Sequence, residues 1–420
     1  MSDFSRRDFL KTAALGSMGL AVGQMLSNSS AALAEEAVGA YKYQGGSNMK
    51  ITKVTPYLCG PRWLMVKVET DSGIYGWGEC GAWAWQTATA EVIKILETLL
   101  IDKDPFKIEW LWNAMMRTPH FRGIILNAAI SGIDIALWDI KGKALGVPVY
   151  ELLGGKIRDK IRAYETCSGK TPEEVAQKVK ELVDQGWKHV RVRPLSDNRS
   201  DTVSGLCTKN EAMFKAIREA VGYEIDISLE IHRQCKPIEA IELGKRLDPY
   251  MVHFLEDPFN DYPEVAKYVS ERCPIPIANG ERAFNIYELA NLVDNTDVAY
   301  LRPDMCTIGG ITAGMKVARI AEAKNVHIIP HNPLGPISTI AALHIDSVVP
   351  NFECQEWPGT FGQFNEMIKG EKIKVENGYI TMPEKPGIGI DLIDDFMEKF
   401  PFQGMKPSWT LHEDGSIVDR

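Results

Sequence analysis

The sequence lacks the features of a small zinc-bound or disulfide-stapled protein. Its eight cysteines are scattered, and no two of them have the C-x-x-C spacing of structural zinc sites. It also lacks a surplus of positive charge, because 47 Lys and Arg against 56 Asp and Glu give a formal net charge of −9. Nucleic acid and anionic membrane surfaces are therefore not expected partners.

What the chain does have is length and apolar content. It has 420 residues, of which 45% are hydrophobic and 25% are charged, and this excludes a disordered or fibrous protein. A chain of this length exceeds one small domain, so we expect a large core or two domains.

The amino terminus has an export pattern. Arg6 and Arg7 form a twin-arginine pair, followed by a mildly apolar run and a small-residue motif that ends at Ala34. The pattern predicts a twin-arginine signal peptide over residues 1–34, cleaved after Ala34, with the twin-arginine export machinery as a partner and a periplasmic location. The alternatives are an amphipathic first helix or a membrane anchor. The apolar run is shorter than the ~20 residues that span a bilayer, so no stable membrane insertion is expected. Residues 35–48 are interpreted as a linker.

Short β-rich runs recur through the second half of the chain. They lie at residues 161–164, 188–193, 225–230, 251–256, 275–278, 298–301, 326–329 and 351–354. Helical patterns follow several of them, at residues 237–247, 262–271, 286–293, 311–323 and 337–347. This alternation predicts an α/β fold in which eight parallel strands close into a barrel.

Six polar residues end or closely follow successive runs. The six are Glu230, Glu256, Glu281, Asp304, His331 and Glu356. Successive members are 26, 25, 23, 27 and 25 residues apart. Because strand ends of this kind open on the same face of a parallel barrel, we expect the six side chains to converge at one mouth.

The pattern ahead of the barrel is different. Residues 49–68 alternate like a strand, and a turn at 70–73 leads to a second run at 75–78, which resembles a hairpin. Helical patterns follow at 87–100 and 126–145. The predicted units are an N-terminal α+β domain over residues 49–155, the barrel over 156–369, and a carboxyl-terminal segment over 370–420 that packs on the first domain.

Three of the converging residues are glutamates from consecutive strand ends. Glu230, Glu256 and Glu281 would repel one another in a shared pocket and raise each other's pKa unless a cation held them. All-oxygen ligation favours a hard ion such as Mg²⁺ over zinc. Taken singly, each acid is more simply a solvated carboxylate or a helix cap, but the periodic set favours a metal site.

Two histidines accompany the glutamates. His232 lies two residues after Glu230, and side chains at i and i+2 of an extended segment point the same way, so His232 is placed to move a proton beside the metal. Asp304 and His331 end consecutive strands, and a carboxylate bonded to an imidazole raises its basicity, as a general base requires. We expect this pair to face the metal from the opposite side.

A base, a divalent cation and an acid together suit the removal of a proton from the carbon beside a carboxylate. If hydroxide then leaves, the reaction is dehydration. If His232 instead returns a proton to the same carbon, the reaction is epimerisation.

At these residues the sequence resembles the enolase superfamily, and within its mandelate racemase/muconate lactonizing group the galactonate dehydratase-like sugar-acid dehydratases, with the mannonate dehydratase-like branch second. The resemblance covers nearly the whole chain from Met49 onward. The matching stretches are PRW at 61–63, GWGE at 76–79, GIDIALWDIKGK at 132–143, GER at 280–282, PD at 303–304, GGIT at 309–312, HNPLGP at 331–336 and CQE at 354–356.

The resemblance implies an enolase fold, a (βα)7β modified TIM barrel with an N-terminal α+β capping domain, assembled as a homo-oligomer. It implies an Mg²⁺-dependent dehydratase that acts through an enediolate on a sugar acid such as an aldonate. The alternative is an epimerase, a racemase or a cycloisomerase on the same scaffold. A third hypothesis, from another class, is a non-catalytic exported binding protein. The implied roles are Mg²⁺ ligands for Glu230, Glu256 and Glu281, base for His331 assisted by Asp304, acid for His232, and hydrogen-bonding partner near the substrate carboxylate for Glu356. The pair of Asp304 and His331 favours the galactonate-like branch.

Two positions depart from the group. The first metal ligand is usually Asp, whereas this chain has Glu230. Where racemases of the group have Lys-x-Lys, this chain has Arg191 and Arg193. Arginine stays protonated and is a poor base, so we interpret these two residues as clamps for a substrate anion or as ion-pair partners. This disfavours a two-base racemase.

The residues that select the substrate are expected in the capping domain and in one barrel loop. Candidate lid positions are residues 59–63, Trp83, Trp85 and residues 118–122, with Trp63 and Arg122 as candidate substrate-binding residues. The insertion at residues 194–210 is either a substrate-facing loop or a surface excursion.

Overall fold

The computed structural model describes residues 48–195, 202–232, 235–259, 262–358, 364–405 and 408–418. The predicted signal peptide and the linker up to residue 47 lie outside the described residues.

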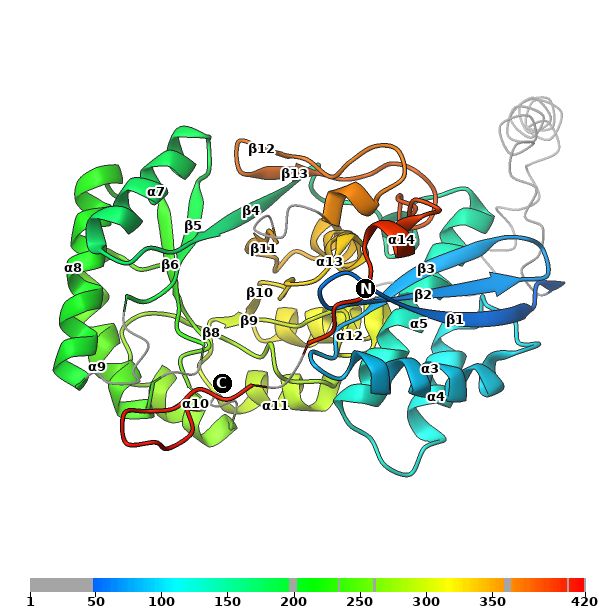
Figure 1. Cartoon of the computed structure of the whole chain (residues 1–420), viewed down its shortest axis with the longest axis horizontal. Coiled ribbons are helices and arrows are strands. Elements are labelled where there is room, and N and C mark those ends of the chain that lie inside the picture. The colour runs from blue at the N-terminus through cyan, green and yellow to red at the C-terminus, as the bar shows by residue number, and fades with distance from the viewer. Residues whose placement is uncertain are drawn as a thin grey trace, which may run out of the picture. The chain divides into compact units, whose positions relative to one another are not determined.

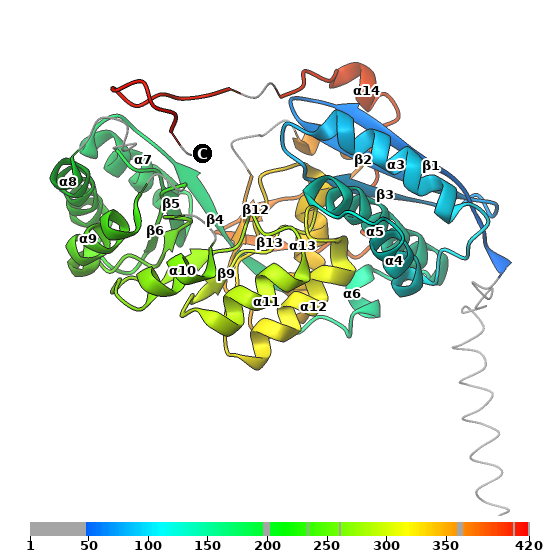
Figure 2. The ribbon, with the colours of Figure 1, turned by 90° about the horizontal axis from the view of Figure 1, so that it is seen from below.

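The N-terminal part is an antiparallel three-stranded sheet covered by helices (Figures 1 and 2). Its strands are β1 (Ile51–Cys59), β2 (Trp63–Thr70) and β3 (Tyr75–Cys80), and its helices are α3 (Gln86–Leu100), α4 (Ile108–Arg117), α5 (Ile124–Leu145) and α6 (Val149–Leu152). The single strand expected over residues 49–68 is wrong, because a turn that begins at Gly60, with φ +57°, divides it in two. Helix α4 was not predicted.

Helix α5 is the central element of this part. It is buried on all sides, which suits its nearly continuous apolar sequence. It approaches β3 so closely that a Cβ on Gly78 would lie 1.8 Å from the Gly132 carbonyl oxygen. Glycine at both positions therefore allows backbone to pack on backbone.

The second part is a closed barrel of eight parallel strands, as the repeat predicted (Figure 1). The strands are β4 (Lys160–Cys167), β5 (His189–Val192), β6 (Asp226–Glu230), β7 (Leu255–Glu256), β8 (Ile277–Asn279), β9 (Tyr300–Leu301), β10 (His327–Ile328) and β11 (Gln355–Glu356). The helices between them are α7 (Pro172–Asp184), α8 (Val203–Val221), α9 (Pro237–Leu247), α10 (Pro263–Ser270), α11 (Ile286–Asn295), α12 (Gly310–Ala323) and α13 (Pro336–Val348).

Closure of the barrel rests on two contacts of the last strand. Strand β11 pairs with β4, and Phe352, just before β11, forms a bridge with Ile328 of β10. Seven helices between eight strands make the (βα)7β barrel, so the predicted fold class is confirmed. Tyr164, Phe254 and Ile329 are among the buried side chains that fill its interior.

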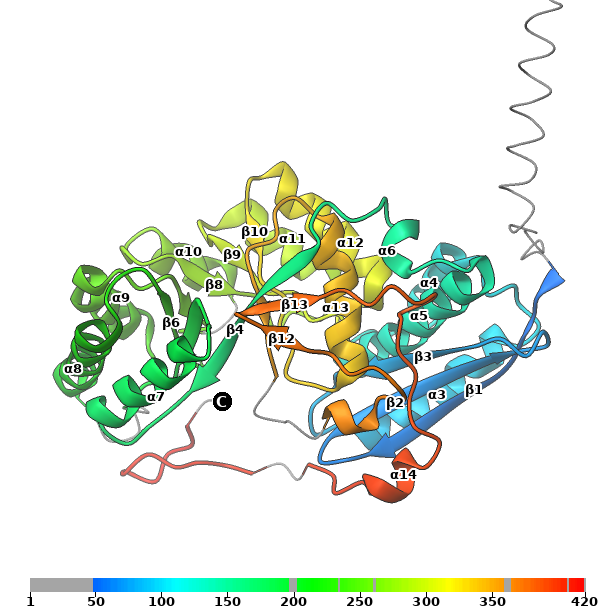
Figure 3. The ribbon, with the colours of Figure 1, turned by 90° about the horizontal axis from the view of Figure 1, so that it is seen from above.

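The carboxyl-terminal segment contacts both parts (Figure 3). It contains η5 (Phe364–Met367), β12 (Val375–Glu376), β13 (Tyr379–Thr381) and α14 (Phe396–Lys399). The barrel itself has one further short helix, η3 (Asp248–Tyr250), after α9. Strand β13 pairs antiparallel with β4, whereas Asp391 accepts hydrogen bonds from Tyr75 Oη and Trp77 Nε1 of the sheet, both at 2.7 Å. The segment thus also extends the barrel, which the sequence did not indicate.

Two further expectations concern loops and membranes. The insertion expected at residues 194–210 is partly helical, because α8 begins at Val203 with Thr202 as its N-cap. Residues 196–201 of it lie outside the described residues. In the described part of the chain, none of the helices combines the length and hydrophobicity needed to cross a bilayer.

Candidate active site

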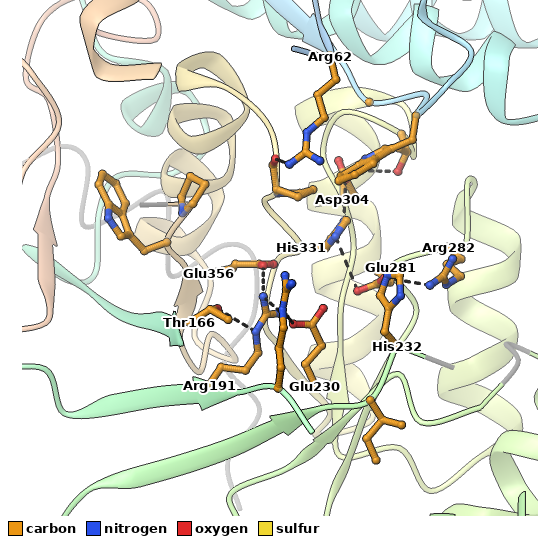
Figure 4. A pocket seen from close by; sticks show the side chains of 18 of the residues that line it. Arg62, Thr166, Arg191, Glu230, His232, Glu281, Arg282, Asp304, His331 and Glu356 are labelled. Carbon is orange, nitrogen blue, oxygen red and sulfur yellow. Dashed lines mark hydrogen bonds and ion pairs between the residues drawn. The ribbon is translucent and has the colours of Figure 1, made fainter. Parts of the chain in front are cut away.

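A pocket of about 680 Å³ lies where the carboxyl ends of the barrel strands face the N-terminal domain (Figure 4). This volume suits a small organic molecule. The N-terminal domain contributes Arg62, Gly81, Trp83, Trp85 and Ile124 to the wall. The barrel contributes, among others, five of the six converging residues predicted from the repeat, which are Glu230, Glu281, Asp304, His331 and Glu356. The sixth, Glu256, is fully buried.

Asp304 and His331 form the predicted pair. The Nδ1 atom of His331 lies 2.9 Å from Asp304 Oδ2, and Asp304 Oδ1 accepts a 2.7 Å hydrogen bond from the Cys306 backbone N–H. Burial alone would lower the pKa of His331, but the Glu281 carboxylate and the bond to Asp304 outweigh it and raise the pKa to about 9. With Nδ1 bonded to Asp304, Nε2 faces Glu281 Oε2 at 3.7 Å. The geometry is that of an imidazole oriented by a carboxylate.

His232 follows β6 on the pocket wall. Its backbone has φ +57°, a left-handed conformation that is uncommon for residues other than glycine. Burial, reinforced by Arg282, lowers the pKa of His232, while Glu281 and Glu230 oppose that shift. The two histidines thus lie in different electrostatic environments, and the roles of His331 as the base and of His232 as the acid both stay predictions.

Two buried arginines, Arg191 and Arg302, form a network of ion pairs with Glu256 and Glu356. Arg191 pairs with Glu256 and places Nη2 2.7 Å from Glu356 Oε1. Arg302 places Nη2 3.1 Å from Glu256 Oε1 and 2.8 Å from Glu356 Oε2, and its Nη1 donates to Tyr164 Oη at 2.9 Å. Although burial opposes it, the two guanidinium groups hold the pKa of Glu356 well below its ordinary value.

The three glutamates fit a hard divalent cation through their charge and their unmet hydrogen-bonding capacity. Among the residues that the structure describes, no three carboxylates or imidazoles stand in a ready ligand cluster, because arginines lie between the acids. Yet Glu256 Oε2 is buried without a hydrogen-bond partner, and desolvation raises the pKa of Glu256 to about 7 despite Arg191 and Arg302. The carboxylates of Glu230, Glu256, Glu281 and Glu356 outnumber the two buried guanidinium groups of Arg191 and Arg302 that they contact, and a divalent cation would offset their repulsion.

The expected substrate-binding residues are placed differently from one another. Trp63 is only 2% exposed and packs on Phe400 with a ring centroid distance of 6.2 Å, so it belongs to the core and not to the pocket wall. Arg122 is exposed and does not line the pocket. Arg191 is an ion-pair partner, as one of the two interpretations held. Arg193 lines the pocket with its side chain 59% exposed, and its Nε lies 3.3 Å from Glu230 Oε2.

Two arginines of the site were not among the predicted site residues, although Arg62 falls within the expected lid positions 59–63. Arg62 precedes β2, stacks on Trp83 at 3.9 Å from the ring centroid, and donates from Nη2 to the Pro333 carbonyl oxygen at 2.9 Å. Alternation at the start of β2 places Arg62 and Trp63 on opposite sides, but it does not indicate which of the two faces the core. Arg302 lies between a strand and the Pro-Asp motif and gave no periodic signal.

Comparison with known proteins agrees with this architecture. Residues 59–154 match the mandelate racemase/muconate lactonizing enzyme N-terminal domain, and residues 174–396 match the enolase C-terminal domain-like family. The D-galactonate dehydratase of Ralstonia pickettii is 37% identical over 382 residues, covering 88% of this chain and 100% of that protein. The D-galactonate dehydratase of Klebsiella pneumoniae is 38% identical over 384 residues with the same coverage.

Solved structures agree as well. An enolase from Pantoea ananatis with bound D-gluconate and Mg has a TM-score of 0.81 and 32% identity, covering 86% of this chain and 97% of that one. A member of the enolase superfamily from Salmonella Typhimurium has a TM-score of 0.79 and 32% identity, covering 84% and 98%. The chain therefore belongs to the mandelate racemase/muconate lactonizing enzyme family of the enolase superfamily.

Proposed function

We propose that this protein is an Mg²⁺-dependent dehydratase that eliminates water from a sugar acid such as an aldonate, giving a 2-keto-3-deoxy acid. The observation that carries the proposal is the Asp304–His331 pair, which faces Glu281 in a pocket of substrate size. The D-galactonate dehydratases that match 88% of the chain and the related structure with D-gluconate and Mg support the same substrate class and metal.

The residues of the pocket supply the two proton transfers that the reaction needs. The Nε2 atom of His331 takes the proton from the carbon beside the carboxylate, while Asp304 keeps Nδ1 protonated. His232 gives a proton to the hydroxyl that leaves the next carbon as water. The enol that remains takes a proton from solvent at that carbon and becomes the keto acid. Glu230, Glu256 and Glu281 would hold Mg²⁺, which would stabilise the negative charge that develops on the substrate carboxylate.

The arginines of the site suit an anionic substrate. Arg62 and Arg193 line the pocket from opposite parts of the fold, and Arg282 joins them on the wall. Arg191 is fully engaged with Glu230, Glu256 and Glu356 and is not available as a second base. This favours dehydration over a two-base racemisation.

A direct test measures keto-acid formation from a panel of acid sugars with and without EDTA, and in D₂O. We expect metal-dependent formation of one keto acid that has a single solvent-derived deuterium at carbon 3. His331→Asn should lower kcat by about 100- to 10,000-fold, the usual contribution of a general base, while His327→Asn, at the start of β10 and outside the pocket, should not change it. Activity that survives His331→Asn, or exchange of the substrate proton without loss of water, would contradict the proposal.

We propose further that the protein is exported by the twin-arginine machinery to the periplasm and is cleaved after Ala34. The twin-arginine pair and the small-residue motif support this proposal. The mature protein should appear in the periplasmic fraction with Glu35 as its first residue, and changing Arg6 and Arg7 together to Lys should retain the precursor in the cytoplasm. A precursor processed equally well without the arginine pair would argue against this route.

We propose that the chain assembles as a symmetric homo-oligomer, as its family resemblance implies. Light scattering of the purified mature protein should give a mass that is a multiple of the chain mass. A single-chain mass at micromolar concentration would exclude it.

A further inference from the structure

Glu79 at the end of β3 reaches from the N-terminal domain into the barrel. It is fully buried, and its two carboxylate oxygens accept backbone hydrogen bonds from the start of α13. Oε1 accepts from the Gly335 N–H at 2.8 Å, and Oε2 accepts from the Ser338 N–H at 2.9 Å. Gly335 is the N-cap of α13 and has no side chain to cap the helix, so Glu79 performs this task from another domain.

The segment that Glu79 holds is the one that contains His331. Only Asn332, Pro333 and Leu334 separate His331 from Gly335. Near its start, the segment is anchored in the barrel, because the Asn332 N–H donates to Glu356 Oε2 at 3.1 Å. At its far end, Glu79 provides the anchor. A shift of α13 away from Glu79 would therefore move the residues that set the position of His331.

The contact between Glu79 and Gly335 is tightly fitted. A Cβ on Gly335 would lie 2.7 Å from Glu79 Oε1, closer than real Cβ contacts allow. Gly335 has φ −98°, a conformation open to any residue, so the constraint is the approach of the carboxylate and not the backbone angle. The site thus depends on this carboxylate and this glycine together.

We propose that Glu79 is a positioning residue for His331: by capping α13 from the N-terminal domain it fixes the segment that presents the imidazole to the pocket. The effect on catalysis rests on the proposed function, whereas the effect on the imidazole does not. Glu79 itself is not among the residues that line the pocket, so it acts through the segment and not by touching the substrate.

The test compares Glu79→Gln with a matched control, Asp139→Asn. Asp139 is also a buried carboxylate of the N-terminal domain that accepts two backbone N–H groups, from Trp77 and Ile388 at 2.9 Å each, but neither belongs to the His331 segment. For Glu79→Gln we expect kcat to fall by about 10- to 100-fold with KM little changed, as for a small displacement of a catalytic group. Asp139→Asn should leave kcat nearly unchanged even where it lowers the melting temperature as much.

A second measurement is independent of activity. The imidazole ¹⁵N NMR signals of His331, identified by their absence in His331→Asn, should shift or split in Glu79→Gln at one fixed pH and stay in place in Asp139→Asn. Gly335→Ala, which disturbs the same contact from the barrel side, should reproduce the change and serves if Glu79→Gln does not fold. Unchanged His331 signals in the folded variants, or equal changes in Asp139→Asn, would overturn the proposal. If no acid sugar is turned over, the proposed function fails but the NMR comparison still decides the role of Glu79.

Discussion

At the scale of single residues, the main feature of the site is a set of buried ion pairs beside the pocket. Arg302 is fully buried and, together with Arg191, compensates the charge of Glu256 and Glu356 in a low-dielectric interior. Arg193 also contacts an acid, Glu230, but most of its side chain is exposed to solvent. The two arginines thus differ in burial more than in partner.

This difference predicts unequal costs for the same substitution. Arg302→Met should lower the free energy of unfolding by about 3–5 kcal/mol, because it leaves Glu256 and Glu356 with only one buried guanidinium group between them. Arg193→Met should lower it by less than about 1 kcal/mol, because solvent screens an exposed pair. Urea unfolding of the metal-free protein measures both. Equal losses would show that burial of the pair does not matter.

His344 in α13 predicts a dependence of stability on pH. It is fully buried, its Nδ1 accepts the Tyr150 N–H and its Nε2 donates to the Ile388 carbonyl oxygen, each at 3.2 Å. Burial lowers its pKa from 6.5 to about 4, while the bond to Ile388 partly opposes the shift. Between pH 6.5 and 4 the imidazole is therefore protonated in the unfolded chain but mostly neutral in the folded chain. The stability of the folded chain is thus highest above pH 6.5 and decreases as the pH falls toward 4.

The measurement compares the wild type with His344→Asn. The difference between their free energies of unfolding should shrink by up to about 1.4 kcal/mol for each pH unit between pH 6.5 and 4, because the wild type alone carries the proton-linked loss. The exposed His120→Asn should show no such trend. A difference that is constant across this range would contradict the linkage.

At the scale of elements, the close packing of β3 on α5 fixes the position of β3, the strand that contains Glu79. Because the added Cβ of Gly78→Ala would meet the rigid backbone at Gly132, we expect a loss of about 1–3 kcal/mol in the free energy of unfolding. Gly123→Ala is the control, since Gly123 has φ 168° and no atom within 4 Å of the new Cβ. Thermal unfolding of both variants measures the difference, and similar melting temperatures would rule out a tight fit here.

The order of the elements was predictable because the barrel repeats one unit. The intervals between strand-end acids indicated that they share a mouth, and helices such as α9 were predicted at their observed bounds. The N-terminal domain has no repeat, so the turn at Gly60 and helix α4 were missed. Nor could local pattern show that Trp63 is buried while Arg62 reaches the pocket, because tertiary contacts decide which side of β2 faces the core. Arg302 and Glu79 were missed for the same reason.

At the scale of the molecule, the two parts of the fold share their stabilising contacts. Asp134 of α5 accepts a hydrogen bond from the Thr312 N–H of α12 at 2.9 Å, and Trp112 Nε1 donates to the Gly309 carbonyl oxygen at 2.8 Å. The carboxyl-terminal segment pairs with the barrel strand β4 and then reaches the N-terminal sheet, where its residue Asp391 accepts a hydrogen bond from Trp77. Neither part keeps its full set of hydrogen bonds without the other, and the pocket exists only between them.

This interdependence predicts a single cooperative unfolding transition for residues 48–420. Seven of the ten tryptophans belong to the N-terminal domain, so tryptophan fluorescence reports mainly on that part, whereas far-UV circular dichroism reports mainly on the more numerous barrel helices. The two signals should give the same urea midpoint, as two-state unfolding requires. Asp391→Asn weakens the hydrogen bonds that join the carboxyl-terminal segment to Tyr75 and Trp77, and it should lower both urea midpoints together. A fluorescence transition that precedes the loss of helix would instead show that the N-terminal domain unfolds alone, and the pocket would then be lost before the barrel.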